Sequence, residues 1–239
     1  TRAVVLSFMD QQMRLGHVLG VVSISTIGLR IVNRCSEVQV IGSNQAPQQK
    51  AASFEAAFHQ LESNRWLPLG LIAAGTLSSV VTPHAPLAAF AAMGGVMLRP
   101  RRAMAVVSLI WLIDQAAGVA LRGYPIEQLS MTWAAVMGAG ALAVSLLFSQ
   151  GPGFCRRSWG GHALWCLLAL TGGFLLYQGT IALVYPVIVD GHSLGAEVIG
   201  GLLQQQLAWG GALAAGHALW LGSTIGSTRP AKSPGEPGL

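Results

Sequence analysis

The stretch from Trp66 to Thr228 holds six arginines, four acidic residues and no lysine among long apolar runs. Over the whole chain only 10% of residues are charged, whereas a soluble globular domain carries about 25%. A chain so poor in charge cannot cover its surface with groups that water solvates well. The sequence therefore predicts an all-α protein, a polytopic bundle of helices integral to a membrane.

Five apolar segments are candidates for crossing the membrane. A helix needs about 20 apolar residues to span the hydrocarbon core, and four segments qualify: 103–121, 132–149, 162–189 and 198–222. The fifth, 67–98, is interrupted by TPHAP at 82–86. As one straight helix it would reach roughly 48 Å, too long for the core, and each half alone is too short. We expect one broken or strongly kinked span there.

Charges in the loops between these segments alternate in a way that predicts sidedness. Lysine and arginine concentrate on the cytoplasmic side of membrane proteins. One set of ends holds Arg99, Arg101, Arg102, Arg156, Arg157, Arg229 and Lys232, and the opposite loops hold Arg122 with Glu127 and Asp190 with Glu197. We therefore expect cytoplasmic arginine-rich loops, a cytoplasmic C-terminus and a bacterial inner membrane. Because the arginines flank apolar segments, they do not indicate nucleic-acid binding.

The chain divides into an N-terminal segment (1–65), the bundle (66–223) and a cytoplasmic tail (224–239) that we expect to be disordered. Within the first part, 15–32 is moderately apolar and fits a sixth span, a signal-like segment or a surface element. Residues 50–64 place Phe54, Phe58 and Leu61 on one helical face and Glu55, His59 and Glu62 on the other. This amphipathic helix is expected on the outer membrane surface, or else packed on a loop.

The pentapeptide GHALW occurs at 161–165 and again at 216–220. Both histidines, His162 and His217, are expected at a similar depth near the cytoplasmic side, as two ligands of one haem iron or transition metal require. Glycine, alanine and leucine are abundant, however, so a chance repeat with interfacial histidines and tryptophans is the favoured interpretation. Cys35, Cys155 and Cys166 have no recognisable ligand spacing and receive no role.

Polar side chains recur within the apolar segments at one expected depth of the outer leaflet. Such residues are costly in a membrane and usually face a protein interior or cavity. They are Asp114, Gln115, Gln178, Gln204, Gln205 and Gln206, with His84 of the TPHAP break somewhat deeper. We interpret them as a site for a small polar solute or metal ion, in which His84 gates or senses protons. The alternative is that the glutamines only join helices.

Two of the expected helices share a faint similarity. WLIDQAAGVALRGYP (111–125) and FLLYQGTIALVYP (174–186) each carry glutamine, then glycine, then tyrosine-proline at the expected outer end. Both helices are expected to run from the cytoplasm outward, so a parallel internal repeat is conceivable. The match is too short to establish one.

Motifs for nucleotide, zinc-protease and dithiol chemistry are absent from the sequence. The leading hypothesis is therefore a membrane transport component, in which Asp114→Asn abolishes ligand binding and leaves folding intact. The second is a non-catalytic subunit of a larger membrane complex, or a self-associating protein, and the third is an electron-transfer subunit with haem on His162 and His217. The sequence favours a non-enzyme, and any catalysis would be redox chemistry on a bound cofactor.

Overall fold

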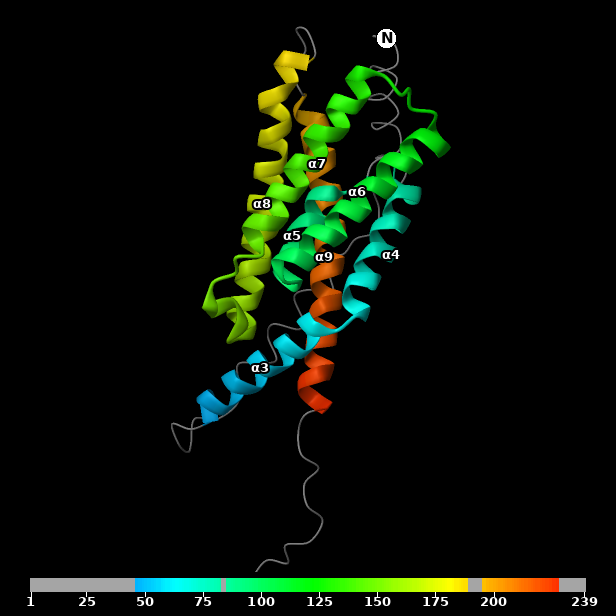
Figure 1. The fold of residues 1–239 in the computed structure, drawn as a ribbon. Helices are drawn as coiled ribbons and strands as arrows, with labels where there is room; N and C mark the ends of the chain where they lie inside the picture. The colour runs from blue at the N-terminus through cyan, green and yellow to red at the C-terminus, as the bar shows by residue number, and fades with distance from the viewer. Residues whose placement is uncertain (1–45, 83–84, 189–194, 228–239) are drawn as a thin grey trace, which may run out of the picture.

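The computed structural model describes residues 46–82, 85–188 and 195–227. This part of the chain is 88% helix and has no strands, which confirms the all-α prediction (Figure 1). The helices are α3 (Ala46–Ser63), α4 (Trp66–Val81), α5 (Leu87–Met97), α6 (Pro100–Arg122), α7 (Gln128–Phe148), the short 3-10 helix η2 (Gly153–Arg156), α8 (Trp159–Ile188) and α9 (Ala196–Ser227). The possible span 15–32 and His84 lie outside the described residues. Helix α9 continues to Ser227, so the first four residues of the expected tail are helical.

Three of the described helices, α6, α7 and α8, are long and apolar enough to cross a membrane. Two further apolar helices, α4 with 16 residues and α5 with 11, are shorter. Helix α9 contains the expected span 198–222 and the three consecutive glutamines, and it is not among the three. The membrane class predicted from the sequence is thus supported by three helices, whereas a count of five or six spans is not established.

The TPHAP break reverses the direction of the chain, so the single kinked span expected at 67–98 is wrong. Near the start of α6, Arg102 donates a hydrogen bond to the Ser63 carbonyl (3.1 Å), just before α4 begins. At the end of α6, Arg122 donates to the Thr82 carbonyl (2.9 Å), just after α4 ends. Helix α4 therefore runs parallel to α6. Helix α5 must return to the start of α6, because only two residues separate them.

The prolines of the break explain why the helix stops where it does. Thr82 precedes Pro83 and is extended, with φ −116° and ψ 145°, as expected because a proline ring disfavours helical geometry in the residue before it. Pro86, with φ −72°, then stands immediately before α5, a place where a proline's missing amide hydrogen costs little. The two prolines thus end one leg of a hairpin and begin the other.

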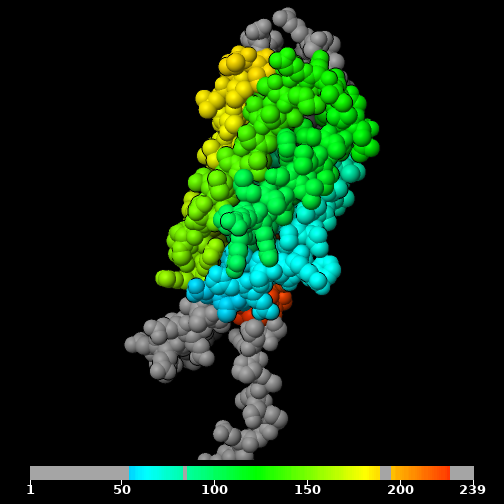
Figure 2. Space-filling view, viewed as in Figure 1, coloured from blue at the N-terminus to red at the C-terminus, as the bar shows by residue number. Residues whose placement is uncertain are grey.

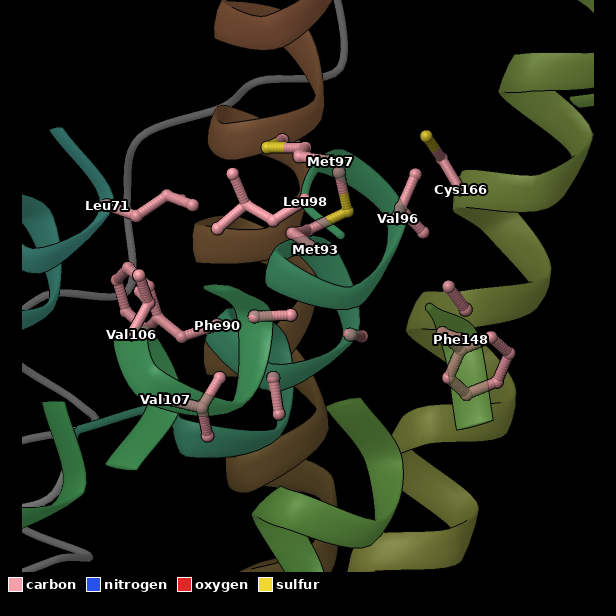
Figure 3. Close-up of a cluster of buried hydrophobic side chains, with 14 of the residues drawn as sticks. Leu71, Phe90, Met93, Val96, Met97, Leu98, Val106, Val107, Phe148 and Cys166 are labelled. Atoms are coloured by element: carbon pink, nitrogen blue, oxygen red, sulfur yellow. The ribbon is translucent and has the colours of Figure 1, made fainter. Parts of the chain in front are cut away.

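Helix α5 lies at the centre of the bundle, surrounded by α6, α7, α8 and α9 (Figure 1). All 11 of its residues are buried, as expected for a helix that is apolar on every side. Figure 3 shows its side chains between those of the neighbouring helices: Phe90, Met93, Val96 and Met97 pack among Leu71, Val106, Val107, Phe148 and Cys166. At 1.5 Å per residue α5 is roughly 16 Å long. Its N-terminal end lies inside the bundle, where the Ala85 amide contacts Asp114 of α6.

The predicted amphipathic helix is present as α3, and it lies across the end of the bundle where the arginine-rich segments gather (Figure 2). Phe54, Phe58 and Leu61 are buried. Contrary to the expected polar face, Glu62 is buried too (2% exposed). It forms ion pairs with Arg99 (3.6 Å) and Arg156 (3.7 Å).

The expected position of α3 on the opposite, outer surface is therefore wrong. It followed from counting 67–98 as one crossing. Because α4 and α5 form a hairpin, the segment before α4 and the segment after α5 emerge at the same end of the bundle.

Cysteine labelling tests this hairpin directly. In a background without the native cysteines, Ser63→Cys and Arg157→Cys are expected to react with a membrane-impermeant maleimide from the same side of the membrane. Ile126→Cys, in the exposed loop between α6 and α7, is expected to react only from the other side. If Ser63→Cys instead reacts from the same side as Ile126→Cys, and from the side opposite to Arg157→Cys, residues 67–98 form a single kinked span.

Candidate functional site: a cavity between the helices

A cavity of about 480 Å³ lies between the first residues of α5 and helices α6, α7, α8 and α9. It lies toward the end of the bundle opposite α3, because residues of the α6–α7 loop form part of its wall. Small-molecule sites usually measure about 300 to 1,000 Å³ and are mostly apolar with a few placed polar groups. This cavity fits that description in both respects.

Most of the polar residues singled out in the sequence meet in the wall of this cavity. Asp114 and Gln115 come from α6, Gln178 from α8, and Gln205 and Gln206 from α9. Gln204 is exposed and does not line it, because successive residues of a helix point about 100° apart. His84 lies outside the described residues, but the adjacent Ala85 and Pro86 line the cavity.

Asp114 is held by contacts with three residues, one just before α5 and two on its own helix. Its Oδ1 accepts a hydrogen bond from the backbone amide of Ala85 (3.2 Å) and lies 3.6 Å from Arg122 Nη1. Its Oδ2 accepts from the side-chain amide of Gln115 (3.5 Å). The positive end of the α5 dipole also points toward this carboxyl group. The charge of Asp114 is thus largely compensated, and substitution at this position acts on stability as well as on the cavity.

Arg122 was expected in a loop and not as a partner of Asp114, but it is the last residue of α6. The signal was nevertheless present. Arg122 follows Asp114 by eight residues, slightly more than two turns of a helix, so the two side chains share a face of α6.

The faint similarity between 111–125 and 174–186 corresponds to matched walls of the cavity. In each segment an aromatic residue, a glutamine four positions later and a tyrosine near the end of the helix line the same space. They are Trp111, Gln115 and Tyr124 from the first segment and Phe174, Gln178 and Tyr185 from the second. Two parallel helices therefore present similar side chains to one cavity.

Small residues of α7 make room for the aromatic walls. A Cβ atom on Gly138 would lie 2.7 Å from the Trp111 ring, and one on Gly140 would lie 3.2 Å from the Tyr177 ring. The Trp111 indole N–H donates to the Ala134 carbonyl (3.0 Å). The ring is therefore held in place by a close packing contact and a hydrogen bond.

Tyr124 contributes to the wall at the end of α6. Gly123 has a left-handed conformation (φ 67°), which is accessible to glycine at little cost, and it turns the chain so that the Tyr124 amide donates to the Gly118 carbonyl (3.1 Å). The ring packs so closely on Gly118 that a Cβ there would lie 2.6 Å away. Burial raises the pKa of the Tyr124 phenol, so it is neutral at pH 7.

The two GHALW histidines lie in contact at the other end of the bundle, near α3. His162 and His217 are 3% and 4% exposed, and His162 Nε2 lies 3.1 Å from His217 Nδ1. Phe58 packs edge-on against both rings, with centroids 5.6 and 6.0 Å away. The two histidines thus form a hydrogen-bonded pair inside the protein, a contact that the favoured interpretation as interfacial residues did not include.

This pair does not have the geometry of two axial haem ligands. Ligands on opposite faces of one iron would stand roughly 4 Å apart, twice a metal–imidazole bond of about 2 Å, with the porphyrin between them. The observed 3.1 Å is a hydrogen-bond distance. Cys166 Sγ lies 3.5 Å from His162 Nε2, but the described part of the chain contains no group of three side chains placed to hold a metal ion.

The chain matches no protein-family model, and comparison with curated proteins and with solved structures finds no similar one.

Proposed function

We propose that this protein is a membrane transport component that binds a small polar solute in the cavity between α5, α6, α7, α8 and α9. The observation that carries the proposal is the convergence of Asp114, Gln115, Gln178 and Gln206 from three helices on one apolar cavity. A half-length helix that ends inside the bundle also supports it, because transporters build binding sites at such broken helices. The proposed setting is a bacterial inner membrane with a cytoplasmic C-terminus.

A solute without strong charge fits this cavity better than a metal ion does. Among the described residues, two acidic side chains line the cavity, Asp114 of α6 and Glu127 of the α6–α7 loop, and Arg122 lies 3.6 Å from Asp114. A cation would have to compete with that arginine and with the positive end of α5. Uncharged polar ligands need only the hydrogen bonds that amides supply.

Filling the cavity tests the proposal with a closely matched control. Ala134 lines the cavity, and its neighbour Ala135 on α7 is exposed outside it. The wild-type protein, extracted gently from its own membrane, is expected to carry a small adduct in a native mass spectrum. Ala134→Trp is expected to lower the fraction carrying the adduct at least about tenfold, because the indole takes up part of the binding space. Ala135→Trp is expected to retain it.

Two results would contradict the transport proposal. One is an adduct that persists in Ala134→Trp at the wild-type level. The other is a protein that carries no small molecule and is always extracted together with other membrane subunits. The latter would favour the second candidate, an accessory subunit without its own ligand.

One observation favours that second candidate. Five glycines of α9 have nothing within 4 Å of the position of a Cβ atom: Gly200, Gly201, Gly211, Gly216 and Gly226. Open glycine-rich helix surfaces let another helix approach closely in a membrane. The mass of the extracted particle distinguishes a lone chain from an assembly, and an optical spectrum of the same sample tests the haem alternative.

A further inference from the structure

Two glutamines of the cavity differ from its other polar groups in having buried atoms without a partner. Within the described part of the chain, Gln178 Oε1 and Gln206 Nε2 are buried and form no hydrogen bond. Gln206 is only 2% exposed, so its amide has no access to bulk solvent. Buried polar groups are nearly always hydrogen-bonded, so this acceptor and this donor mark the place where a ligand would be recognised.

Two other polar residues of the wall, Asp114 and Trp111, are already engaged. Asp114 accepts from Ala85 and Gln115 and pairs with Arg122. The Trp111 indole donates to the Ala134 carbonyl. The unpaired acceptor and donor on α8 and α9 are therefore the groups that discriminate between ligands.

A ligand that satisfies this acceptor and this donor together presents a donor beside an acceptor along one edge. A lactam edge, with N–H next to C=O, has this pattern in a rigid form. Because the side-chain amide of glutamine carries both a donor and an acceptor, such an edge can be matched in either direction. A site that hydrogen-bonds such groups strongly rejects analogues that lack them, since its own buried polar atoms are then left unpaired.

The walls of the cavity favour a flat ring. Aromatic side chains line it from three helices: Trp111 and Trp133 on α6 and α7, and Phe174, Tyr177 and Tyr185 on α8. Trp133 and Tyr185 pack against each other with ring centroids 5.7 Å apart. Aromatic rings pair with other rings in offset-stacked or edge-to-face geometry. Asp114 is paired with Arg122, so its charge is compensated, and Glu127 of the α6–α7 loop is the other acidic residue of the wall as far as the structure describes it.

We infer that the cavity binds an uncharged, planar heterocycle through its lactam edge, with Gln178 accepting from the ring N–H and Gln206 donating to the ring carbonyl. This inference rests on the proposed function and specifies the class of solute.

Binding of defined heterocycles to the purified full chain tests the inference. The probes are uracil, hypoxanthine and lumichrome, each paired with its analogue methylated at every lactam nitrogen, with choline and Co²⁺ as ligands of other classes. At least one lactam is expected to bind in titration calorimetry. Its methylated analogue is expected to bind roughly tenfold more weakly or worse, since a buried acceptor then has no donor. This comparison uses the wild-type protein and does not depend on any variant folding.

Substitutions assign the effect to particular residues. Gln206→Met and Gln178→Met remove the amide and keep the length of the side chain, and each is expected to weaken lactam binding roughly tenfold. Gln204→Met is the matched control, because Gln204 lies on the same helix but is exposed outside the cavity. It is expected to bind as the wild type does.

The following results would overturn the inference, and they show whether the proposed function fails with it. Equal binding of a lactam and its methylated analogue, or unchanged binding in Gln206→Met, would exclude recognition of the edge. Binding of choline or Co²⁺ with no lactam bound would overturn the ligand class and leave a solute-binding function intact. If no probe binds, the native adduct decides: an adduct without a lactam overturns the inference alone, and the absence of any adduct overturns both.

Discussion

Arg122→Gln is expected to destabilise the bundle by about 3 kcal/mol, the typical cost of removing one partner from a buried ion pair. Arg122 lies 3.6 Å from Asp114 and donates hydrogen bonds to the Ser79 and Thr82 carbonyls at the end of α4. Its loss leaves the Asp114 carboxylate without its cation and frees the turn of the hairpin. Equilibrium unfolding by SDS in mixed micelles measures the change in the free energy of unfolding.

The double variant Asp114→Asn/Arg122→Gln separates these contributions. Removing both charges is expected to recover part of the loss, with a coupling energy of about 1 to 3 kcal/mol between the two positions. Arg101→Gln, a change at an exposed arginine of the same helix, is expected to stay within about 0.5 kcal/mol of the wild type. A coupling energy near zero would mean that Asp114 and Arg122 do not form a pair.

Gly95→Ala is the second change expected to have a large effect, a loss of about 2 kcal/mol. Gly95 faces the backbone of α7, where a Cβ atom would lie 2.7 Å from the Ser145 carbonyl oxygen and 3.1 Å from the Ser149 amide nitrogen. Backbone atoms cannot move aside as the end of a flexible side chain can. Forcing extra volume into a packed core typically costs about 1 to 3 kcal/mol, and α5 would have to separate from α7.

The neighbouring glycine provides a control of identical chemistry. A Cβ on Gly94 would meet only Val107 Cγ2 at 3.6 Å, an ordinary contact. Since alanine is favoured over glycine in helices by about 1 kcal/mol, Gly94→Ala is expected to be neutral or stabilising. Comparable thermal midpoints for Gly94→Ala and Gly95→Ala would contradict the close approach of α5 and α7.

The helical elements were predictable from the sequence, and so was the common level of Asp114, Gln178 and Gln206 along three helices. Apolar runs of about 20 residues indicate helices in a membrane, and the fixed rise of a helix converts residue number into depth. This is why Asp114, Gln178 and Gln206, on three different helices, were expected at one level. The structure brings all three to one cavity. Their role in binding remains a proposal.

The direction of the chain at 82–86 was not predictable in the same way. Two prolines predict a break, and a kinked span and a hairpin have the same hydropathy. The decisive contacts are long-range hydrogen bonds: Arg122 to the end of α4, and Ala85 to Asp114. The predicted side of α3 depended on the number of crossings. The incorrect prediction of a single kinked span at 67–98 therefore placed α3 at the wrong end of the bundle.

The contact between His162 and His217 is also one that the sequence could not predict. Depth along two antiparallel helices placed His162 and His217 near each other, but the rotation of each helix about its axis is set by packing. The contact of both rings with Phe58 of α3 depends on an element outside both helices. Neither the 3.1 Å contact nor its geometry, which differs from that of two axial haem ligands, follows from the repeated pentapeptide.

The sequence by itself determined that this protein is helical and that three of its described helices are long and apolar enough to cross a membrane. These properties depend on local composition and on the fixed geometry of the helix. Only the tertiary structure decided that α5 turns back into the centre, that Arg122 neutralises Asp114, and that Gln178 and Gln206 share a cavity from which Gln204 is excluded. Those properties depend on contacts between distant segments, where the rotation and direction of each helix are fixed by packing against its neighbours.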